Sequence, residues 1–175
     1  MTNSNSSNSP YILEMRNVSK TFPGVKALDQ INLRVKRGSV HALMGENGAG
    51  KSTLMKSLYG IYIPDEGGEL ILDDKPFKPG RPIDAIRRGL TMVPQEISPA
   101  ANLTIADNFY LGREITKGKF FLNQKAMNEQ ASAILKELGV PMDVTEKMSD
   151  VSVAKAQLVA IATAVSNDAK VIIMD

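Results

Sequence analysis

A glycine-rich loop at residues 45–52, with the sequence Gly-Glu-Asn-Gly-Ala-Gly-Lys-Ser, constrains this chain more than any other feature. Its glycines allow the backbone to curl so that several N–H groups point inward, which creates a site for an anion. A predicted strand at residues 40–44 precedes the loop and a predicted helix at residues 51–58 follows it, as a phosphate-binding loop requires. A glycine turn that only joins a strand to a helix would not need the Lys-Ser pair. The loop therefore predicts a site for the phosphates of a nucleotide.

Each residue type in the loop has an expected task. Lys51 is expected to reach the β- and γ-phosphates of ATP, and the Ser52 hydroxyl is expected to bind Mg²⁺. The start of the following helix adds its partial positive charge. The predicted nucleotide-binding residues here are Gly45, Glu46, Asn47, Gly48, Ala49, Gly50, Lys51, Ser52 and Thr53. The pattern alone does not separate a transporter ATPase from a nucleotide kinase or a GTPase.

The composition is that of one ordinary globular domain, with 175 residues of which 43% are hydrophobic and 23% charged. The 21 basic and 19 acidic residues are spread along the chain, so no basic face favours nucleic acid as a partner. The lack of cysteine excludes disulfides and thiolate metal sites, and the single histidine, His41, cannot form a zinc site alone. Because His41 lies in an apolar run, we expect it to be a packed strand residue.

Neither end of the chain resembles a targeting or membrane segment. Residues 1–10 have no basic start and no apolar stretch, so we expect a disordered leader there rather than a secretory signal. The longest apolar stretches, at residues 158–165 and 171–174, are far shorter than the ~20 residues that a membrane-spanning helix needs. We therefore expect a cytosolic chain whose membrane association would come through a partner.

Apolar periodicity and turn residues predict a mixed α/β chain with a helical insertion. Strands are predicted at residues 12–16, 31–35, 40–44, 69–72, 91–93 and 171–174, and helices at residues 51–58, 82–88, 105–111, 124–138 and 154–165. The expected domains are a leader at 1–10, the first part of a nucleotide-binding α/β core at 11–97, a helical subdomain at 98–150, and a helix with a buried strand at 151–175. A buried parallel strand normally leads into a further crossover element, so we expect the sequence to be truncated after Asp175.

Further segments resemble the ATP-binding subunits of ABC transporters, in their order and at about their spacing. Phe22 lies where that family places an aromatic ring under the adenine, and such stacking contributes roughly 1–3 kcal/mol. The resemblance implies that Gln95 is the glutamine of a loop that contacts Mg²⁺ or the attacking water and senses the membrane partner. It also implies that residues 171–174 are the Walker B strand, and that Asp175 holds Mg²⁺ through water. The alternative for Phe22 is a phenylalanine of the core without contact to a base. The alternative for Asp175 is an exposed aspartate at the end of a strand without a metal.

The sequence Val-Ser-Val-Ala-Lys at residues 151–155 stands where the family has its signature, usually Leu-Ser-Gly-Gly-Gln. In the family this segment closes over the γ-phosphate held by the opposite subunit. Ser152 can cap the following helix and present its hydroxyl to phosphate. Val153 and Ala154 replace glycines, so we expect their Cβ atoms to hinder close approach of the partner's nucleotide. Lys155 replaces a neutral glutamine, and we expect its charge to offset the weakened contacts.

Within this family the chain most resembles the ATPases of monosaccharide importers, which carry two nucleotide-binding domains in tandem. Residues 13–29, 41–55, 95–96, 102–114 and 170–175 carry that likeness, while residues 11–15 and 116–120 look most like the galactose/methyl-galactoside subgroup. The fold class implied is a P-loop NTPase of the ABC ATPase type, with a mixed sheet and a helical subdomain, truncated at the Walker B strand.

The resemblance also implies the working partners. These are ATP and Mg²⁺, two membrane permease subunits, a periplasmic or extracellular sugar-binding protein and a second nucleotide-binding domain, at the cytoplasmic face of the membrane. The family's catalytic base is a glutamate directly after the position of Asp175, so we expect residues 1–175 alone to be inactive. Two alternatives remain open: a soluble ABC ATPase that acts without a membrane partner, and a decayed, non-catalytic nucleotide-binding module.

Overall fold

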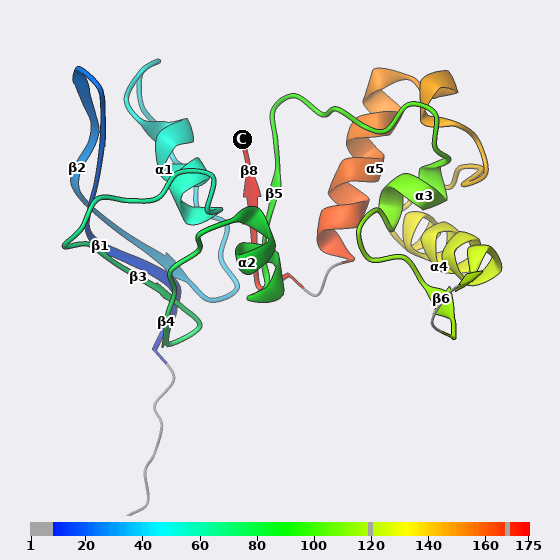
Figure 1. Cartoon of the computed structure of the whole chain (residues 1–175), viewed down its shortest axis with the longest axis horizontal. Helices are drawn as coiled ribbons and strands as arrows, with labels where there is room; N and C mark the ends of the chain where they lie inside the picture. Colours follow the sequence, from blue (N-terminus) through cyan, green and yellow to red (C-terminus); the bar gives the residue numbers. More distant parts are fainter. Residues whose placement is uncertain (1–8, 119–120, 167–168) are drawn as a thin grey trace, which may run out of the picture. The chain divides into compact units, whose positions relative to one another are not determined.

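The computed structural model describes residues 9–118, 121–166 and 169–175 (Figure 1). It forms two compact units, one made of Met1–Thr91 together with Asp175 and the other of Met92–Met174. Residues 1–8 of the expected leader, and residues 119–120 of the segment that resembles the galactoside subgroup, lie outside the described residues.

The first unit is built on an antiparallel sheet in the order β2-β1-β3-β4. Its two long strands, β1 (Tyr11–Phe22) and β2 (Val25–Lys36), form a hairpin that turns at Gly24, whose φ of 82° suits a residue without Cβ. Strand β3 (Glu69–Leu72) pairs with the other edge of β1, and the short β4 (Lys75–Pro76) pairs with β3.

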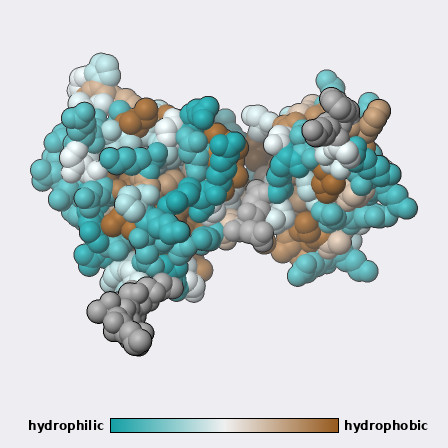
Figure 2. Space-filling view, turned by 60° about the horizontal axis from the view of Figure 1, so that its bottom comes forward, coloured by the Kyte–Doolittle hydropathy of each residue, from teal (hydrophilic) through white to brown (hydrophobic). Residues whose placement is uncertain are grey.

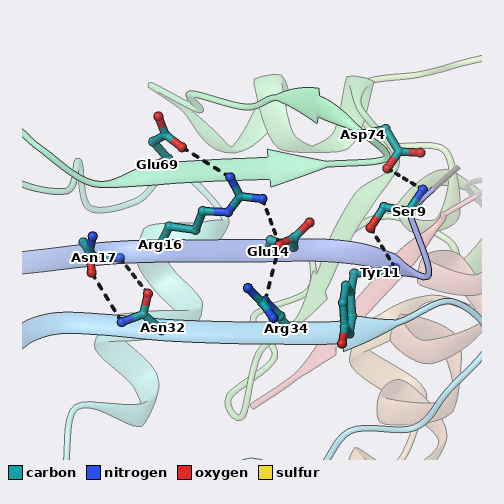
Figure 3. Close-up of polar contacts among 9 residues, drawn as sticks. All are labelled: Ser9, Tyr11, Glu14, Arg16, Asn17, Asn32, Arg34, Glu69 and Asp74. Carbon is teal, nitrogen blue, oxygen red and sulfur yellow. Dashed lines mark hydrogen bonds and ion pairs between the residues drawn. The ribbon is translucent and has the colours of Figure 1, made fainter. Parts of the chain in front are cut away.

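Both hairpin strands are longer than the sequence predicts, because bulges let polar residues take part in them. Asn17 and Gln30 have positive φ angles of 52° and 47°, and the register of β1 against β2 shifts nearby. The Asn17 N–H donates to the side chain of Asn32 at 3.1 Å (Figure 3), and the Gln30 N–H donates to the Ser19 hydroxyl at 2.9 Å. Side chains that suggest a loop in the sequence therefore satisfy the irregular backbone of a continuous strand.

A buried carboxylate lies in the middle of this sheet. Glu14 accepts a hydrogen bond from Arg16 at 3.1 Å and lies 3.5 Å from the Nε of Arg34 on β2 (Figure 3). Arg16 also reaches Glu69 of β3 at 3.8 Å. Because a buried charge is costly unless it is paired, the two arginines explain how Glu14 is accommodated.

The helices of the first unit follow the sequence closely. Helix α1 spans Lys51–Leu58 as predicted and buries Leu54 and Leu58. Helix α2 spans Pro82–Arg87, with its proline in the first turn, where a missing N–H costs nothing.

The predicted strand at residues 40–44 is wrong. Val40 and Met44 are 102% and 89% exposed, and His41, expected to be packed, is exposed as well. A strand requires a neighbour for its backbone hydrogen bonds. None of the strands within the described ranges pairs with this segment, and β5 (Leu90–Val93) and β8 (Val171–Met174) pair with each other instead.

The second unit is mainly helical, as the sequence predicts. Helices α3 (Ile105–Phe109), α4 (Gln124–Glu137) and α5 (Val153–Val165) pack around one core, with a short 3₁₀ turn at Met148–Asp150. On α4 the buried residues Met127, Ala131 and Leu135 recur every four positions, as one face of a helix requires. The sequence did not predict the small hairpin of β6 (Thr116–Lys117) and β7 (Phe121–Leu122).

On the face drawn in Figure 2, most of the surface is hydrophilic and hydrophobic side chains show only in places. No helix in the part of the chain that the structure describes has both the length and the apolar character to cross a bilayer.

Candidate nucleotide-binding site

The glycine-rich loop adopts a backbone that requires glycine at two positions. Gly48 and Gly50 have φ angles of 85° and 84°, in the left-handed region that other residues rarely enter. Gly50 also lies against β2, so that a Cβ there would come within 2.6 Å of the Ala27 carbonyl oxygen. The loop thus contacts the hairpin of the first unit at Gly50, while residues 45–49 remain exposed.

Helix α1 begins at the end of this loop with a free N-terminus. Among the described residues, no side chain caps its first turn, and its first ladder bond runs from the Leu54 N–H to the Gly50 carbonyl at 2.8 Å. The first N–H groups of a helix have no partner within the helix, and they carry its partial positive charge. This geometry favours an anion at the loop.

The Lys51 side chain supplies a full positive charge at the same place. Its Nζ donates to the carbonyl oxygens of Gly45 and Glu46, both at 2.7 Å. The ammonium therefore lies across the loop, held by two neutral acceptors that an anionic phosphate oxygen would readily replace.

Ser52 lies beside Asp175, although the two are 123 positions apart in the sequence. The Ser52 hydroxyl donates to the Asp175 carboxylate at 3.2 Å, and both side chains are exposed. Mg²⁺ prefers hard oxygen ligands and usually keeps several waters when it is bound by one or two protein groups and by phosphates. A hydroxyl and a carboxylate next to a phosphate-binding loop fit that ion.

Phe22 is the last residue of β1, and its ring is partly exposed. The ring of Tyr62 packs against it with centroids 5.1 Å apart and planes at 79°, and the Nζ of Lys20 lies 5.4 Å from the Phe22 centroid. The sequence did not predict Tyr62 or Lys20 as neighbours of Phe22, because no local pattern relates the segment after α1 to the end of β1.

The other predicted site residues belong to the second unit. Gln95 is exposed in a bend two residues after the end of β5. Ser152 is the N-cap of α5, and its hydroxyl accepts from the Lys155 N–H at 3.4 Å. Val153 is 74% exposed, and Ala154 and Lys155 are exposed as well. The roles of these residues toward a nucleotide remain predictions.

The sequence matches the ABC transporter family over residues 28–175. The chain belongs to this family, as the sequence analysis predicted. Two solved structures of ATP-binding cassettes of ABC transporters agree with this. One is an ADP conformation with a TM-score of 0.77 and 27% identity, covering 93% of this chain and 67% of that one. The other, which is nucleotide-free, has a TM-score of 0.77 and 30% identity, covering 94% and 68%.

Among curated proteins, the galactose/methyl galactoside import ATP-binding protein MglA of Clostridium perfringens is 49% identical over 165 residues, which are 94% of this chain and 32% of that protein. MglA of Fusobacterium nucleatum is 46% identical over 168 residues, which are 96% of this chain and 33% of that protein. These similarities confirm the predicted resemblance to galactoside import proteins. The chain spans about a third of the length of the curated relatives that it matches.

Proposed function

We propose that this chain forms part of the ATP-binding subunit of an ABC importer that couples ATP hydrolysis to the uptake of a monosaccharide, with galactose or methyl galactoside as its substrate class. One observation carries the nucleotide part of the proposal. The positive end of α1, the Lys51 ammonium and the Ser52–Asp175 pair belong to one compact unit and surround one loop. The names of the relatives, together with their sequence identity to this chain, support a monosaccharide as the substrate.

The residues of the loop would act together on ATP and Mg²⁺. The N–H groups of the loop and of the first turn of α1 would hold the β- and γ-phosphates, and Lys51 would exchange its two carbonyl contacts for phosphate oxygens. Ser52 and Asp175 would hold Mg²⁺, which supplies positive charge to the transferring phosphoryl group. Gln95 would contact that ion or the attacking water, and Phe22 would stack on the adenine base.

The working protein would include other chains and domains. We propose two membrane permease subunits, an extracytoplasmic sugar-binding protein and a second nucleotide-binding domain as partners, with this chain at the cytoplasmic face of the membrane. The relatives are named as ATP-binding proteins for import of galactose and methyl galactoside, which supports these partners.

The altered signature favours a second candidate, a nucleotide-binding module with reduced turnover. Val153 and Ala154 project Cβ atoms from the start of α5, where glycines would let a partner's phosphate approach closely. If this candidate is right, Val153→Gly and Ala154→Gly together should raise the ATPase rate of the full-length protein. An unchanged rate would remove the support for it.

The nucleotide proposal is tested by calorimetric titration of the full-length protein with ATP and Mg²⁺. Lys51→Ala should weaken binding about ten- to hundredfold, because a hydrogen bond to a charged group contributes ~1.5–3 kcal/mol. Lys125→Ala on α4 removes the same charge from an exposed position and should leave the affinity unchanged. Equal affinities for all three proteins would contradict the proposal.

The sugar is tested separately, by uptake of labelled galactose in cells whose own copy of the gene carries Lys51→Ala. We expect uptake to fall to the background of a gene deletion. Normal galactose uptake alongside a loss of ATP binding would show that the substrate belongs to another class.

A further inference from the structure

Tyr62 lies in a segment that the structure holds in one place. It follows α1, and the N–H groups of Ile61 and Tyr62 both donate to the Lys56 carbonyl, at 2.9 and 3.2 Å. Just before it, Gly60 has a φ of 79° and approaches the Arg81 carbonyl so closely that a Cβ would come within 2.9 Å of that oxygen. The chain therefore leaves α1 in a defined direction, and this direction aims Tyr62 at the hairpin.

The rings of Tyr62 and Phe22 meet in an edge-to-face arrangement. Their centroids are 5.1 Å apart and their planes are inclined by 79°, a geometry that the opposite charges of ring edge and ring face favour. Each ring also has an ammonium near it: Lys20 lies 5.4 Å from the Phe22 centroid, and Lys56 lies 5.9 Å from the Tyr62 centroid. Phe22 thus has two neighbours that oppose its rotation.

Hydrogen bonds connect the segment after Tyr62 to strand β1. Lys20 donates to the Ile63 carbonyl at 2.8 Å, and the Thr21 hydroxyl donates to the Asp65 carboxylate at 2.7 Å. The Asp65 N–H donates to the Ser19 carbonyl at 2.9 Å. The hydrogen bond from Thr21 lowers the pKa of Asp65, so this carboxylate stays charged at neutral pH. The segment that carries Tyr62 is therefore bonded to the strand that carries Phe22.

The same hairpin supports the phosphate-binding loop. Gly50 lies against Ala27 of β2, and Val25, which pairs with Phe22, is two positions along that strand. A strand rises ~3.4 Å per residue, so the strand pair at Phe22 lies roughly 7 Å from the place where the loop is seated. A base attached to phosphates in the loop would have the Phe22 ring within its reach.

We propose that Tyr62 is a positioning residue for the nucleotide base: it fixes the orientation of the Phe22 ring, so that the ring is ready to stack on a purine. This rests on the proposed function, since it requires that Phe22 binds the base. Lys20 assists from the ring face, and the contacts from Thr21 and Asp65 keep the two segments together. A preordered ring loses less freedom when the base binds, so the affinity for ATP rises without any contact between Tyr62 and the base.

The test compares ATP with inorganic tripolyphosphate, which occupies a phosphate site but has no base. Calorimetry on the full-length protein would give the affinity for both, with Mg²⁺ present. Tyr62→Ala should weaken the affinity for ATP about two- to tenfold, the size expected for the loss of one aromatic pair. The affinity for tripolyphosphate should stay unchanged. Tyr62→Phe keeps the ring and should restore the affinity for ATP. Phe22→Ala should weaken the affinity for ATP at least as much. The double variant Phe22→Ala, Tyr62→Ala should bind ATP as strongly as Phe22→Ala alone.

The outcomes separate the inference from the proposed function. If Phe22→Ala leaves the ratio of the two affinities unchanged, Phe22 does not bind the base and that part of the proposed function fails. If Phe22→Ala lowers the ratio but Tyr62→Ala does not, the role of Tyr62 is overturned while the proposed function stands. Equal loss of affinity for ATP and for tripolyphosphate in Tyr62→Ala would also overturn it, since this result indicates general disruption of the fold. A Tyr62→Phe variant as weak as Tyr62→Ala would overturn it as well, since the ring would then not be what positions Phe22.

Discussion

The Ser52 hydroxyl donates a hydrogen bond to the Asp175 carboxylate at 3.2 Å. Ser52 lies in the first turn of α1, and Asp175 directly follows β8, so the fold brings the two positions together at the phosphate-binding loop. The hydrogen bond joins two oxygen-bearing side chains of the kind that Mg²⁺ prefers. We expect Mg²⁺ to bind the Ser52 hydroxyl directly and the Asp175 carboxylate through water.

Ser52→Ala should therefore weaken nucleotide binding only when Mg²⁺ is present. Loss of a residue that only supports a metal ligand reduces metal affinity about 10–100-fold, so we expect the loss of the Ser52 hydroxyl to cost at least about tenfold. Titration with ATP and Mg²⁺, and then with ATP and a chelator, measures the two cases. Ser57→Ala, a serine on the buried side of the same helix, is the matched control and should leave both affinities unchanged. An equal loss with and without Mg²⁺ would argue against a metal at this position.

Ser57→Ala should make the chain more stable. Ser57 is fully buried, and its hydroxyl is the one buried side-chain polar atom within the described residues that has no hydrogen-bond partner. A buried hydroxyl without a partner costs ~1–3 kcal/mol, and alanine also has the higher helix propensity. We expect the free energy of unfolding in urea to rise by about 1 kcal/mol. A loss of stability would mean that the hydroxyl has a partner, such as a bound water.

Gly50→Ala should be more damaging than Gly48→Ala. Both residues have left-handed backbones, which cost other residues roughly 1–2 kcal/mol. At Gly48 nothing lies within 4 Å of an added Cβ, whereas at Gly50 the Ala27 carbonyl oxygen would lie at 2.6 Å. Urea denaturation of both variants measures the difference. Equal losses would show that the loop can move away from β2 at no cost.

The start of α3 should lose stability at acid pH. Thr104 and Asp107 form a capping box, in which the Asp107 N–H donates to the Thr104 hydroxyl at 3.1 Å and the Thr104 N–H donates to the Asp107 carboxylate at 3.2 Å. Burial alone would raise the pKa of Asp107, but the hydrogen bonds from Thr104 and Gln124 lower it overall. An aspartate whose pKa is lowered by folding stabilises the fold above its unfolded pKa of about 3.9, and this contribution disappears as the pH falls through the folded pKa.

Asp107→Ala should accordingly destabilise the chain by about 1 kcal/mol at pH 7, the usual value of a helix cap. The difference from the wild type should shrink as the pH falls below about 4, where the wild type loses the same contribution. Urea denaturation at a series of pH values measures both. A difference that stays constant down to pH 2 would contradict the role assigned to the charged carboxylate.

Lys155→Gln should weaken ATP-driven association of the nucleotide-binding domains. Lys155 is exposed in the first turn of α5, beside the capping hydroxyl of Ser152, so its charge is available to a phosphate on a partner. Light scattering of the full-length protein with and without ATP measures the association. An unchanged dimer population in Lys155→Gln would show that the lysine does not compensate for the missing glycines.

Local patterns predicted the elements that are defined by residues close together in the sequence. Helix α1, strand β3 and strand β8 have the predicted bounds, and α4 and α5 differ by one residue at one end. Periodic burial and turn residues act over a few positions, so these elements can be recognised before the fold is known. The glycine-rich loop at residues 45–52 can be recognised in the same way, because its glycines and its lysine lie in one short segment, and its role toward phosphate stays a prediction.

No pattern within one segment predicted which distant segments meet. The family resemblance had assigned Ser52 and Asp175 to one Mg²⁺, and the structure shows the hydrogen bond between them. Only the tertiary structure placed Tyr62 against Phe22 and left residues 40–44 without the neighbouring strand that an apolar segment needs. The physical reason is the same in each case. A strand, a metal site or a ring pair depends on partners far away in the sequence, and no pattern of side chains within one segment states which partners the chain will bring to it.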